Sequence, residues 1–347
     1  MKRQLAALLL TIFALSLTAC GETAAESETR TVYAMDTVMN LTVYGENAAA
    51  ALESAEKELH TLDEAVLSRT AEGSELYALN TSNGETVECG ADDILPALIE
   101  TALTISDATD GAFDPTLAPV LDAWGFTKDE RRVPSADELK ELLGHTGCGK
   151  VALEKTADGW TVTLLDGAQL DLGGIAKGYA SDRLADIFAQ YGVDSALVSL
   201  GGNVYARGTK PGGAAWSVAV QHPEQEGYAA MLSLTDAFAV TSGGYQRYFT
   251  GPDGTVYQHI LDPKTGWPVQ GDLLSVTIVA DNGTMADAYS TALYVMGREA
   301  AQDFWRQNGG FDMVLITKDG QVLYTPGLAD KLTETEGSGY AYACIEP

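Results

Sequence analysis

The residues best suited to bind a phosphate lie in segment 170–180, which has the sequence LDLGGIAKGYA. A strand pattern ends at Gly173 and Gly174, and an apolar stripe of helical spacing begins at Ile175. Glycines at a helix N-terminus let backbone N–H groups approach an anion closely, where the helix dipole favours negative charge. The spacing matches neither the dinucleotide fingerprint nor the phosphate loop. By itself, the segment fits a tight strand-to-helix turn as well as a ligand site.

A second segment, ADAYSTAL at 286–293, places three side-chain oxygens on one helical face. At about 100° per residue, Asp287, Ser290 and Thr291 fall within roughly one third of the circumference, and Tyr289 and Leu293 face the other side. One carboxylate with hydroxyl and carbonyl oxygens suits a hard cation that keeps open positions for substrate phosphates, which indicates Mg²⁺. The alternative is a solvated helix face with an acidic first turn.

His259 ends a predicted strand, shortly before the Asp-Pro turn at 262–263. Near neutral pH an imidazole can take a proton from an attacking hydroxyl, so His259 is a candidate general base. A lone histidine at a strand end can also have a purely structural role, and both roles stay open. Asp262 is expected to shape the turn rather than to catalyse.

The elements that must position these residues follow no strict alternation. Apolar stripes of helical spacing follow Asn47, Asp92 and Ser135, and Ser135 forms a capping box with Glu138 in a helix that ends at Gly144. Strand patterns then cover 160–165, 196–200, 216–220 and 274–280, and a hairpin of 313–317 and 322–325 turns at 318–320. This order favours an α+β fold over a doubly wound sheet.

The chain is strongly acidic. It has 347 residues and a formal net charge of −28, from 21 Lys and Arg against 49 Asp and Glu. This length suits one large domain or two fused lobes, and 46% hydrophobic residues are typical of a globular protein. Nucleic-acid binding needs a basic surface, so the composition argues against a nucleic-acid partner. An acidic surface would also repel a phosphate substrate, which favours a bound cation.

The N-terminus predicts export with a lipid anchor. Lys2 and Arg3 precede an apolar run at 5–17, which is shorter than the roughly 20 residues of a membrane span. The sequence LTAC at 17–20 matches a bacterial lipobox, in which Cys20 becomes the lipidated first residue; the alternative is an ordinary secretory signal. We expect a signal peptide at 1–19, lipidated Cys20 with a flexible tether at 20–31, and one catalytic domain at 32–347. The protein would then lie on the extracytoplasmic face of the cell membrane.

Three further cysteines, Cys89, Cys148 and Cys344, lie far apart in the sequence. An odd number without close spacing supports neither a zinc site nor a disulfide framework. We expect small core residues with a structural role, although one disulfide stays open in an exported protein.

Seven short motifs occur in the order found in the FAD:protein FMN transferases, the ApbE family. They are MDT at 35–37, FDPT at 113–116, DLGGIAKG at 171–178, SLGGN at 199–203, TSG at 241–243, HILDP at 259–263 and ADA at 286–288. The resemblance covers about residues 32–325, and a lipobox is frequent in this family. It implies an ApbE-like α+β fold of mixed, largely antiparallel sheets with flanking helices.

The resemblance also implies a Mg²⁺-dependent reaction. FAD is cleaved, AMP leaves, and FMN is esterified through its phosphate to a Thr or Ser of an acceptor protein. By motif match, Asp287, Ser290, Thr291 and the backbone carbonyl of Gly174 resemble the metal ligands, and His259 resembles the catalytic base. With Asp287, His259 is therefore expected to be essential to the chemistry. The positions that resemble the family's FAD contacts are Met35, Ala112, Phe113, Asp114, Asp171, Lys177 and Leu261.

Two positions depart from the family's pattern. Thr70 stands where members commonly carry an aromatic ring against the flavin, so the flavin contact at this position stays open. Lys177 stands where some members have Glu, and a lysine could pair with a phosphate or ribose oxygen.

Two other functions remain as alternatives. A Mg²⁺-dependent FAD pyrophosphatase would release FMN and AMP to water. A flavin-binding lipoprotein, or one that captures another small molecule for a transporter, would have two similar α/β lobes and would leave Asp287, Thr291 and His259 unexplained.

Overall fold

The computed structural model describes residues 26–126, 130–252 and 254–347. The predicted signal peptide and Cys20 lie outside the described residues. The first strand, β1 (Ser27–Ala34), begins within the segment predicted as a tether, so residues 27–31 belong to the folded part of the chain. Among the described residues, no helix is long and apolar enough to cross a membrane.

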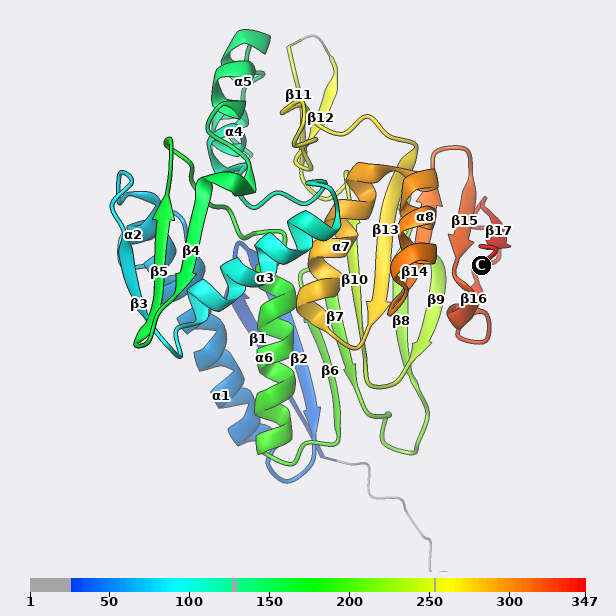
Figure 1. Ribbon diagram of the computed structural model, residues 1–347. Coiled ribbons are helices and arrows are strands. Elements are labelled where there is room, and N and C mark those ends of the chain that lie inside the picture. Colours follow the sequence, from blue (N-terminus) through cyan, green and yellow to red (C-terminus); the bar gives the residue numbers. More distant parts are fainter. Residues whose placement is uncertain (1–25, 127–129, 253) are drawn as a thin grey trace, which may run out of the picture.

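A nine-stranded sheet forms the centre of the fold (Figure 1). Neighbouring strands run antiparallel, except for the last pair, which is parallel. In order across the sheet, the strands are β1, β2 (Thr37–Tyr44), β6 (Ser195–Leu200), β7 (Asn203–Arg207), β10 (Ala237–Gly243), β13 (Leu273–Ala280), β14 (Asp312–Thr317), β15 (Gln321–Tyr324) and β17 (Ala341–Cys344).

The two faces of this sheet are covered differently. Helices α1 (Ala48–His60), α6 (Ala176–Gln190), α7 (Gly283–Met296) and α8 (Arg298–Asn308) lie on one face (Figure 1). A small sheet of β8 (Trp216–Gln221), β9 (Tyr228–Leu234) and β16 (Leu332–Glu334) packs on part of the other face. Each face therefore has its own apolar core, and the core under the helices, which we call the helix-side core, is the larger.

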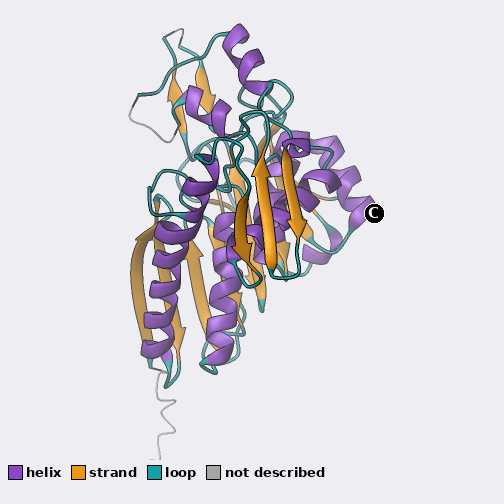
Figure 2. Cartoon of the chain, turned by 60° about the vertical axis from the view of Figure 1, so that its left-hand side comes forward, coloured by secondary structure: helices purple, strands orange, loops and turns teal. Residues whose placement is uncertain are grey.

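Two smaller units flank the central layers. The first contains the sheet β3 (Val87–Gly90), β5 (Gly159–Leu164) and β4 (Val151–Lys155), which comes forward in Figure 2, with the π-helix η1 (Thr61–Leu67), α2 (Glu75–Asn80) and α3 (Ile94–Ala108). The second lies beyond one end of the central sheet and joins α4 (Ala118–Trp124) and α5 (Ala136–Leu143) to the hairpin of β11 (Tyr248–Thr250) and β12 (Val256–Gln258). Trp124 packs against Tyr257 and Trp267 in its core. The remaining short elements are the 3-10 helices η2 (Cys148–Lys150) and η3 (Pro326–Leu328).

The structure confirms the α+β fold and the predicted helices and strands, with one exception. The strand expected to end at Gly173 is absent: residues 170–172 are irregular, and only an isolated bridge between Leu117 and Gln169 precedes them. Ser135 caps α5 by accepting a hydrogen bond from the backbone N of Glu138 at 3.2 Å, and α5 ends at Gly144. Asn47 precedes α1, but its side chain donates to the Tyr191 carbonyl at 2.8 Å instead of capping the helix. Asp93, rather than Asp92, is the residue before α3.

The cysteine prediction is correct only in part. Cys89, Cys148 and Cys344 are free thiols. Cys89 and Cys148 are half-buried, whereas Cys344 is exposed at the end of β17. The expectation of a core residue is therefore wrong for Cys344, because β17 is an edge strand.

Candidate active site

Helix α7, which carries the predicted metal ligands, is held at its N-terminus by two side chains. Asn282 accepts a hydrogen bond from the backbone N of Met285 at 2.7 Å, as an N-cap residue does. The carboxylate of Asp182, from α6, accepts from the backbone N of Gly283 at 2.7 Å and of Thr284 at 2.8 Å. The N–H groups that an isolated helix leaves unpaired are thus satisfied, and α7 is fixed against α6.

Helices α6 and α7 approach closely where two glycines meet. A Cβ atom on Gly178 would overlap the carbonyl of Gly283 and lie 2.6 Å from the Cβ of Asp287. The backbone N of Gly178 donates to Asp287 Oδ2 at 2.8 Å, and Asp287 is 4% exposed. One carboxylate oxygen is therefore fixed by α6. The alternative of a solvated helix face is wrong, since α6 and the sheet cover this side of α7.

Hydroxyl groups gather beside this carboxylate. Ser242 Oγ, at the end of β10, lies 2.7 Å from Ser290 Oγ and 3.2 Å from Thr291 Oγ1. Ser290 Oγ also donates to the carbonyl of Asp287 at 2.8 Å. Thr291 Oγ1 would lie 3.6 Å from a Cβ on Gly174, so the Gly174 turn adjoins the same cluster. The structure thus brings the four predicted metal-site residues together and adds Ser242.

This oxygen cluster has the composition of a magnesium site. In the described parts of the chain, no three His, Cys, Asp or Glu residues gather closely enough to hold a metal ion. A cation here would have one carboxylate and otherwise neutral oxygens, which suits Mg²⁺ because it keeps waters and substrate phosphates as further ligands. Sequence reasoning missed Ser242, although the TSG motif at 241–243 contains it.

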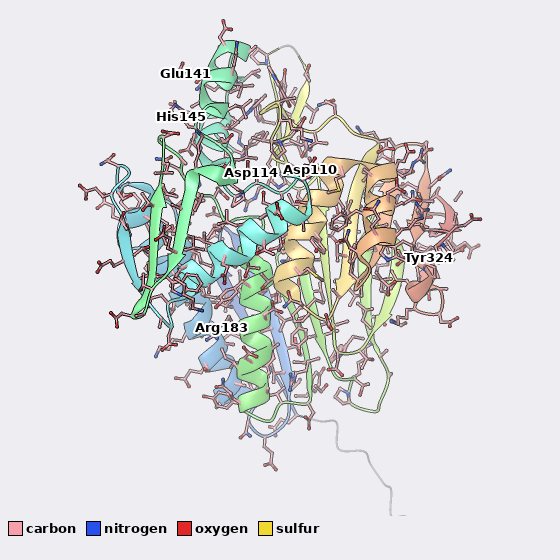
Figure 3. All side chains as sticks on the ribbon, viewed as in Figure 1. Asp110, Asp114, Glu141, His145, Arg183 and Tyr324 are labelled. Carbon is pink, nitrogen blue, oxygen red and sulfur yellow. The ribbon has the colours of Figure 1, made fainter. Side chains whose placement is uncertain are left out.

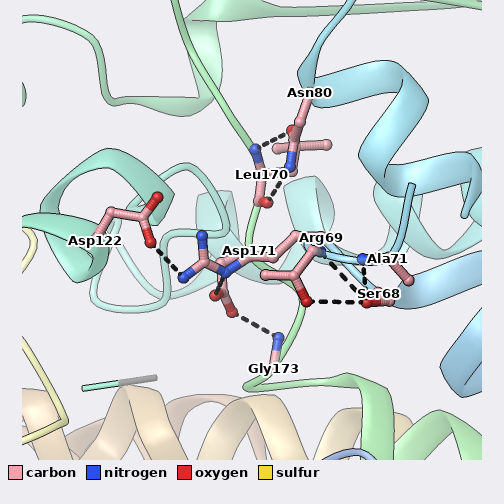
Figure 4. Close-up of polar contacts among 9 residues, drawn as sticks. Ser68, Arg69, Ala71, Asn80, Asp122, Leu170, Asp171 and Gly173 are labelled. Atoms are coloured by element: carbon pink, nitrogen blue, oxygen red, sulfur yellow. Dashed lines mark hydrogen bonds and ion pairs between the residues drawn. The ribbon is translucent and has the colours of Figure 1, made fainter. Parts of the chain in front are cut away.

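The turn that leads into α6 is fixed by the half-buried Arg69 (Figure 4). Asp171 Oδ1 accepts a hydrogen bond from the backbone N of Gly173 at 2.8 Å, and Asp171 Oδ2 pairs with Arg69 Nε at 2.8 Å. Arg69 also pairs with Asp122 at 2.7 Å. Both oxygens of the Asp171 carboxylate are thus engaged by the protein. Sequence reasoning missed Arg69 and singled out its neighbour Thr70, whose side chain is exposed.

His259 has the environment of a neutral base. Its Nδ1 lies 3.2 Å from the carbonyl of Arg247, so Nδ1 carries the hydrogen and Nε2 is the acceptor nitrogen. Burial and the positive charges of Arg247 and Lys177 lower the pKa of His259 to about 4. The imidazole is therefore unprotonated at neutral pH. Asp262 shapes the following turn as expected, because its Oδ1 accepts from the backbone N of Lys264 at 2.9 Å.

The β1–β2 turn lies at the same end of the sheet. Met35 and Asp36 both have left-handed backbones, with φ of 50° and 57°, and connect the paired residues Ala34 and Thr37. Arg247 Nη2 donates to the carbonyl of Asp36 at 3.2 Å. The predicted FAD contact Met35 is therefore linked through Arg247 to the segment that holds His259.

The other predicted FAD contacts differ in what they can offer a ligand. Asp114 (labelled in Figure 3) accepts through Oδ1 from the backbone N of Thr116 at 2.8 Å and from its hydroxyl at 2.5 Å. Lys177 Nζ donates weakly to the Gly173 carbonyl at 3.4 Å and remains close enough to act on His259. Three of the predicted FAD contacts are buried hydrophobic residues: Ala112, Phe113 and Leu261.

The family model and the related sequences all match this chain over most of its length. The model of the ApbE family matches residues 35–315. A FAD:protein FMN transferase of Treponema pallidum is 36% identical over 331 residues, which are 90% of this chain and 91% of that protein. One from Escherichia coli K12 is 30% identical over 298 residues, 84% of each chain.

Solved structures are also similar. The ApbE protein of Thermotoga maritima aligns with a TM-score of 0.79 and 33% identity, over 90% of this chain and 97% of that one. The apo form of the flavinyl transferase ApbE of Pseudomonas stutzeri aligns with a TM-score of 0.75 and 29% identity, over 90% of this chain and 95% of that one. The family model, the related sequences and the solved structures thus all match most of the chain.

Proposed function

Because this chain belongs to the ApbE family, we propose that it is a flavin transferase that cleaves FAD and attaches FMN to an acceptor protein. The observation that carries the proposal is the buried carboxylate of Asp287, fixed by Gly178 beside the hydroxyls of Ser242, Ser290 and Thr291. A carboxylate buried among hydroxyls and a backbone turn, with a neutral histidine at the same end of the sheet, suits phosphoryl transfer.

The residues that would hold Mg²⁺ are Asp287, Thr291, Ser290 and the carbonyl of Gly174, with Ser242 as a further oxygen. The backbone N of Gly178 donates to Oδ2 of Asp287, which leaves Oδ1 for the cation. Bound there, Mg²⁺ would neutralise charge on the diphosphate of FAD and assist the departure of AMP.

The chain's own residues would then activate the acceptor. His259 Nε2 takes the proton of a Thr or Ser hydroxyl, whose oxygen forms a bond to the phosphorus of the FMN half. The bond from that phosphorus to the AMP oxygen breaks, and AMP leaves with the electron pair. The diphosphate offsets the charges of Lys177 and Arg247, so the pKa of His259 rises on FAD binding and favours holding the proton.

The decisive experiment incubates the full chain with FAD and Mg²⁺, with and without candidate acceptor proteins from the same organism. We expect release of AMP together with flavin fluorescence that stays on the denatured acceptor. AMP release without labelled acceptor would favour the FAD pyrophosphatase instead. If neither product forms with any acceptor, the proposal fails and a binding role remains, although the single nine-stranded sheet differs from the two similar lobes expected of a transport receptor.

We also propose that Cys20 carries a lipid and holds the domain on the extracytoplasmic face of the membrane. The support is the lipobox LTAC at 17–20. Cells that express the full chain are labelled with a fatty acid analogue and then fractionated. Label in the wild type and its loss in Cys20→Ser are expected, and an unlabelled wild-type chain would contradict the anchor.

A further inference from the structure

One buried amide in the candidate active site has no hydrogen-bond partner. Asn203 opens β7 and is 2% exposed, yet in the described part of the chain its Nδ2 donates to no acceptor. Leaving a buried donor unpaired costs about 1–3 kcal/mol, so native proteins rarely keep one without a reason. The motif SLGGN at 199–203 contains this residue, and the reaction described above gives it no role.

The strand register places this amide on the helix-covered face of the sheet. Asn203 lies directly opposite Leu200 of β6 and Val240 of β10. Both of these residues belong to the helix-side core, and directly opposed residues of antiparallel strands project to the same face. Ser242 follows Val240 by two residues and projects to this face as well, where it meets Thr291. The amide therefore lies on the same face of the sheet as the oxygen cluster of the candidate metal site, and its pairing partner Val240 is two residues from Ser242.

The turn before Asn203 joins it to the other parts of the site. Gly201 and Gly202 both have left-handed backbones, with φ of 59° and 105°. A Cβ on Gly201 would lie 2.8 Å from Cγ2 of Thr37, directly after the Met35 turn. A Cβ on Gly202 would lie 3.4 Å from Nε2 of Gln246, next to Arg247. The turn that precedes Asn203 thus lies between the β1–β2 turn and the segment that positions His259.

We propose that Asn203 is a substrate-binding residue whose Nδ2 donates a hydrogen bond to an oxygen of FAD. The inference rests on the proposed function, because FAD is the ligand that this site would take. FAD presents flavin carbonyl, ribityl and phosphate oxygens, and any of these supplies the acceptor that the protein lacks. An amide left unpaired in the free protein gains its full hydrogen bond only when the ligand binds.

The test compares ligand binding with stability in Asn203→Leu. Leucine has nearly the same branched shape as asparagine and lacks the donor. We expect FAD to bind about tenfold more weakly, measured by the quenching of flavin fluorescence in the full chain with Mg²⁺ present. The free variant is expected to melt at the wild-type temperature or above it, because the unpaired donor has been removed.

A matched control is Ser275→Ala. Ser275 is 1% exposed and its hydroxyl also has no partner within the described residues, but it alternates with Val276 on β13 and projects to the opposite face of the sheet. This variant is expected to bind FAD as the wild type does. If Asn203→Leu does not fold, Asn203→Asp keeps the shape and the polarity, and FAD binding above pH 7 is expected to fall at least as far.

Titrations with FMN and ADP locate the acceptor oxygen. Weaker binding of FMN by Asn203→Leu places the oxygen on the flavin half, and weaker binding of ADP places it on the nucleotide half. Unchanged binding of FAD, or a lower melting temperature with unchanged binding, would overturn the inference and make Asn203 structural. A wild-type chain that does not bind FAD would instead contradict the proposed function.

Discussion

The two sides of the candidate active site are held by different means. On one side, α6 and α7 touch through their backbones at Gly178 and Gly283, and the carboxylates of the buried Asp287 and the half-buried Asp182 each accept from free N–H groups of the opposite helix. On the other side, Arg247 and His259 flank the hairpin of β11 and β12, where the backbone N and Nδ1 of His259 both donate to the carbonyl of Arg247 and Arg247 donates to the carbonyl of Asp36. The contacts between the helices fix the position of the Asp287 carboxylate in a packed core. The surroundings of His259 instead keep its imidazole unprotonated, through burial and nearby positive charge.

Substitutions in α6 and α7 should therefore change metal binding and the stability of the fold together. Substitutions around His259 and Arg247 should mainly change the reaction rate and its pH dependence. The following variants test this separation.

Asp287→Asn should have the largest effect. Asparagine can still accept from Gly178, so the fold is retained, but the charged oxygen that would bind the cation is lost. The stabilisation that a catalytic cation gives is worth several kcal/mol, so AMP release should fall at least about 1000-fold. Asp287→Ala should abolish it. Wild-type rates of AMP release at ordinary Mg²⁺ concentrations would remove Asp287 from the metal site.

Gly178→Ala should come next, with a loss of about 3 kcal/mol in the free energy of unfolding. The added methyl group meets the Gly283 carbonyl and Asp287, and neither can move without separating the helices. Urea denaturation measures the loss. Gly73→Ala is the matched control, because a Cβ there meets nothing within 4 Å. Equal stability of the two variants would contradict the close approach of α6 and α7.

His259→Ala should lower flavin transfer about 100-fold and leave FAD binding nearly unchanged, since a general base contributes to the rate rather than to ligand affinity. Transfer to the acceptor and quenching of flavin fluorescence are measured on the same samples. Unchanged transfer would reduce His259 to a structural role.

The pH dependence sharpens this prediction. Since the pKa of His259 in the free enzyme is about 4, kcat/KM for FAD, which reports the enzyme before FAD binds, should show no loss due to this residue between pH 8 and about pH 5. The unfolded chain binds the proton near pH 6.5, so its extra proton uptake should lower stability as the pH falls from 6.5 to 4. His259→Gln should flatten that part of the stability profile, whereas an identical profile would contradict the low pKa.

Asp182→Asn should have the smallest effect. Asparagine can accept only in part from the two N–H groups of α7, so the free energy of unfolding should fall by about 1 kcal/mol. Binding of Mn²⁺, measured by electron paramagnetic resonance, should weaken about tenfold, because Asp182 fixes the N-terminus of α7, the helix that carries Asp287. Asp186→Asn, one turn along α6 and exposed, should change neither quantity. Equal Mn²⁺ affinity in both variants would separate Asp182 from the site.

Local sequence patterns predicted the elements that carry their own signals. The N-cap Ser135 of α5 and the stripe of α7 depend on residues three or four positions apart, so both were found correctly. The second half of the predicted capping box did not form, because the carboxylate of Glu138 pairs with Arg132. The β1–β2 hairpin was missed because Met35 and Asp36 adopt left-handed backbones without the glycine that usually marks such a turn. Ser242 and Arg69 were missed because their partners are distant in sequence, and only the fold brings them together.

The order of strands in the central sheet has a consequence for how the chain is made. β2 pairs with β6, so about 150 residues are synthesised after the first hairpin before its inner edge finds a partner. Until then β2 presents unpaired backbone groups and the apolar side chains of Met39, Leu41 and Val43. The hairpin can therefore associate with other strands until β6 pairs with it, and more polar side chains on this face of β2 would lower that tendency but weaken the core of the folded protein.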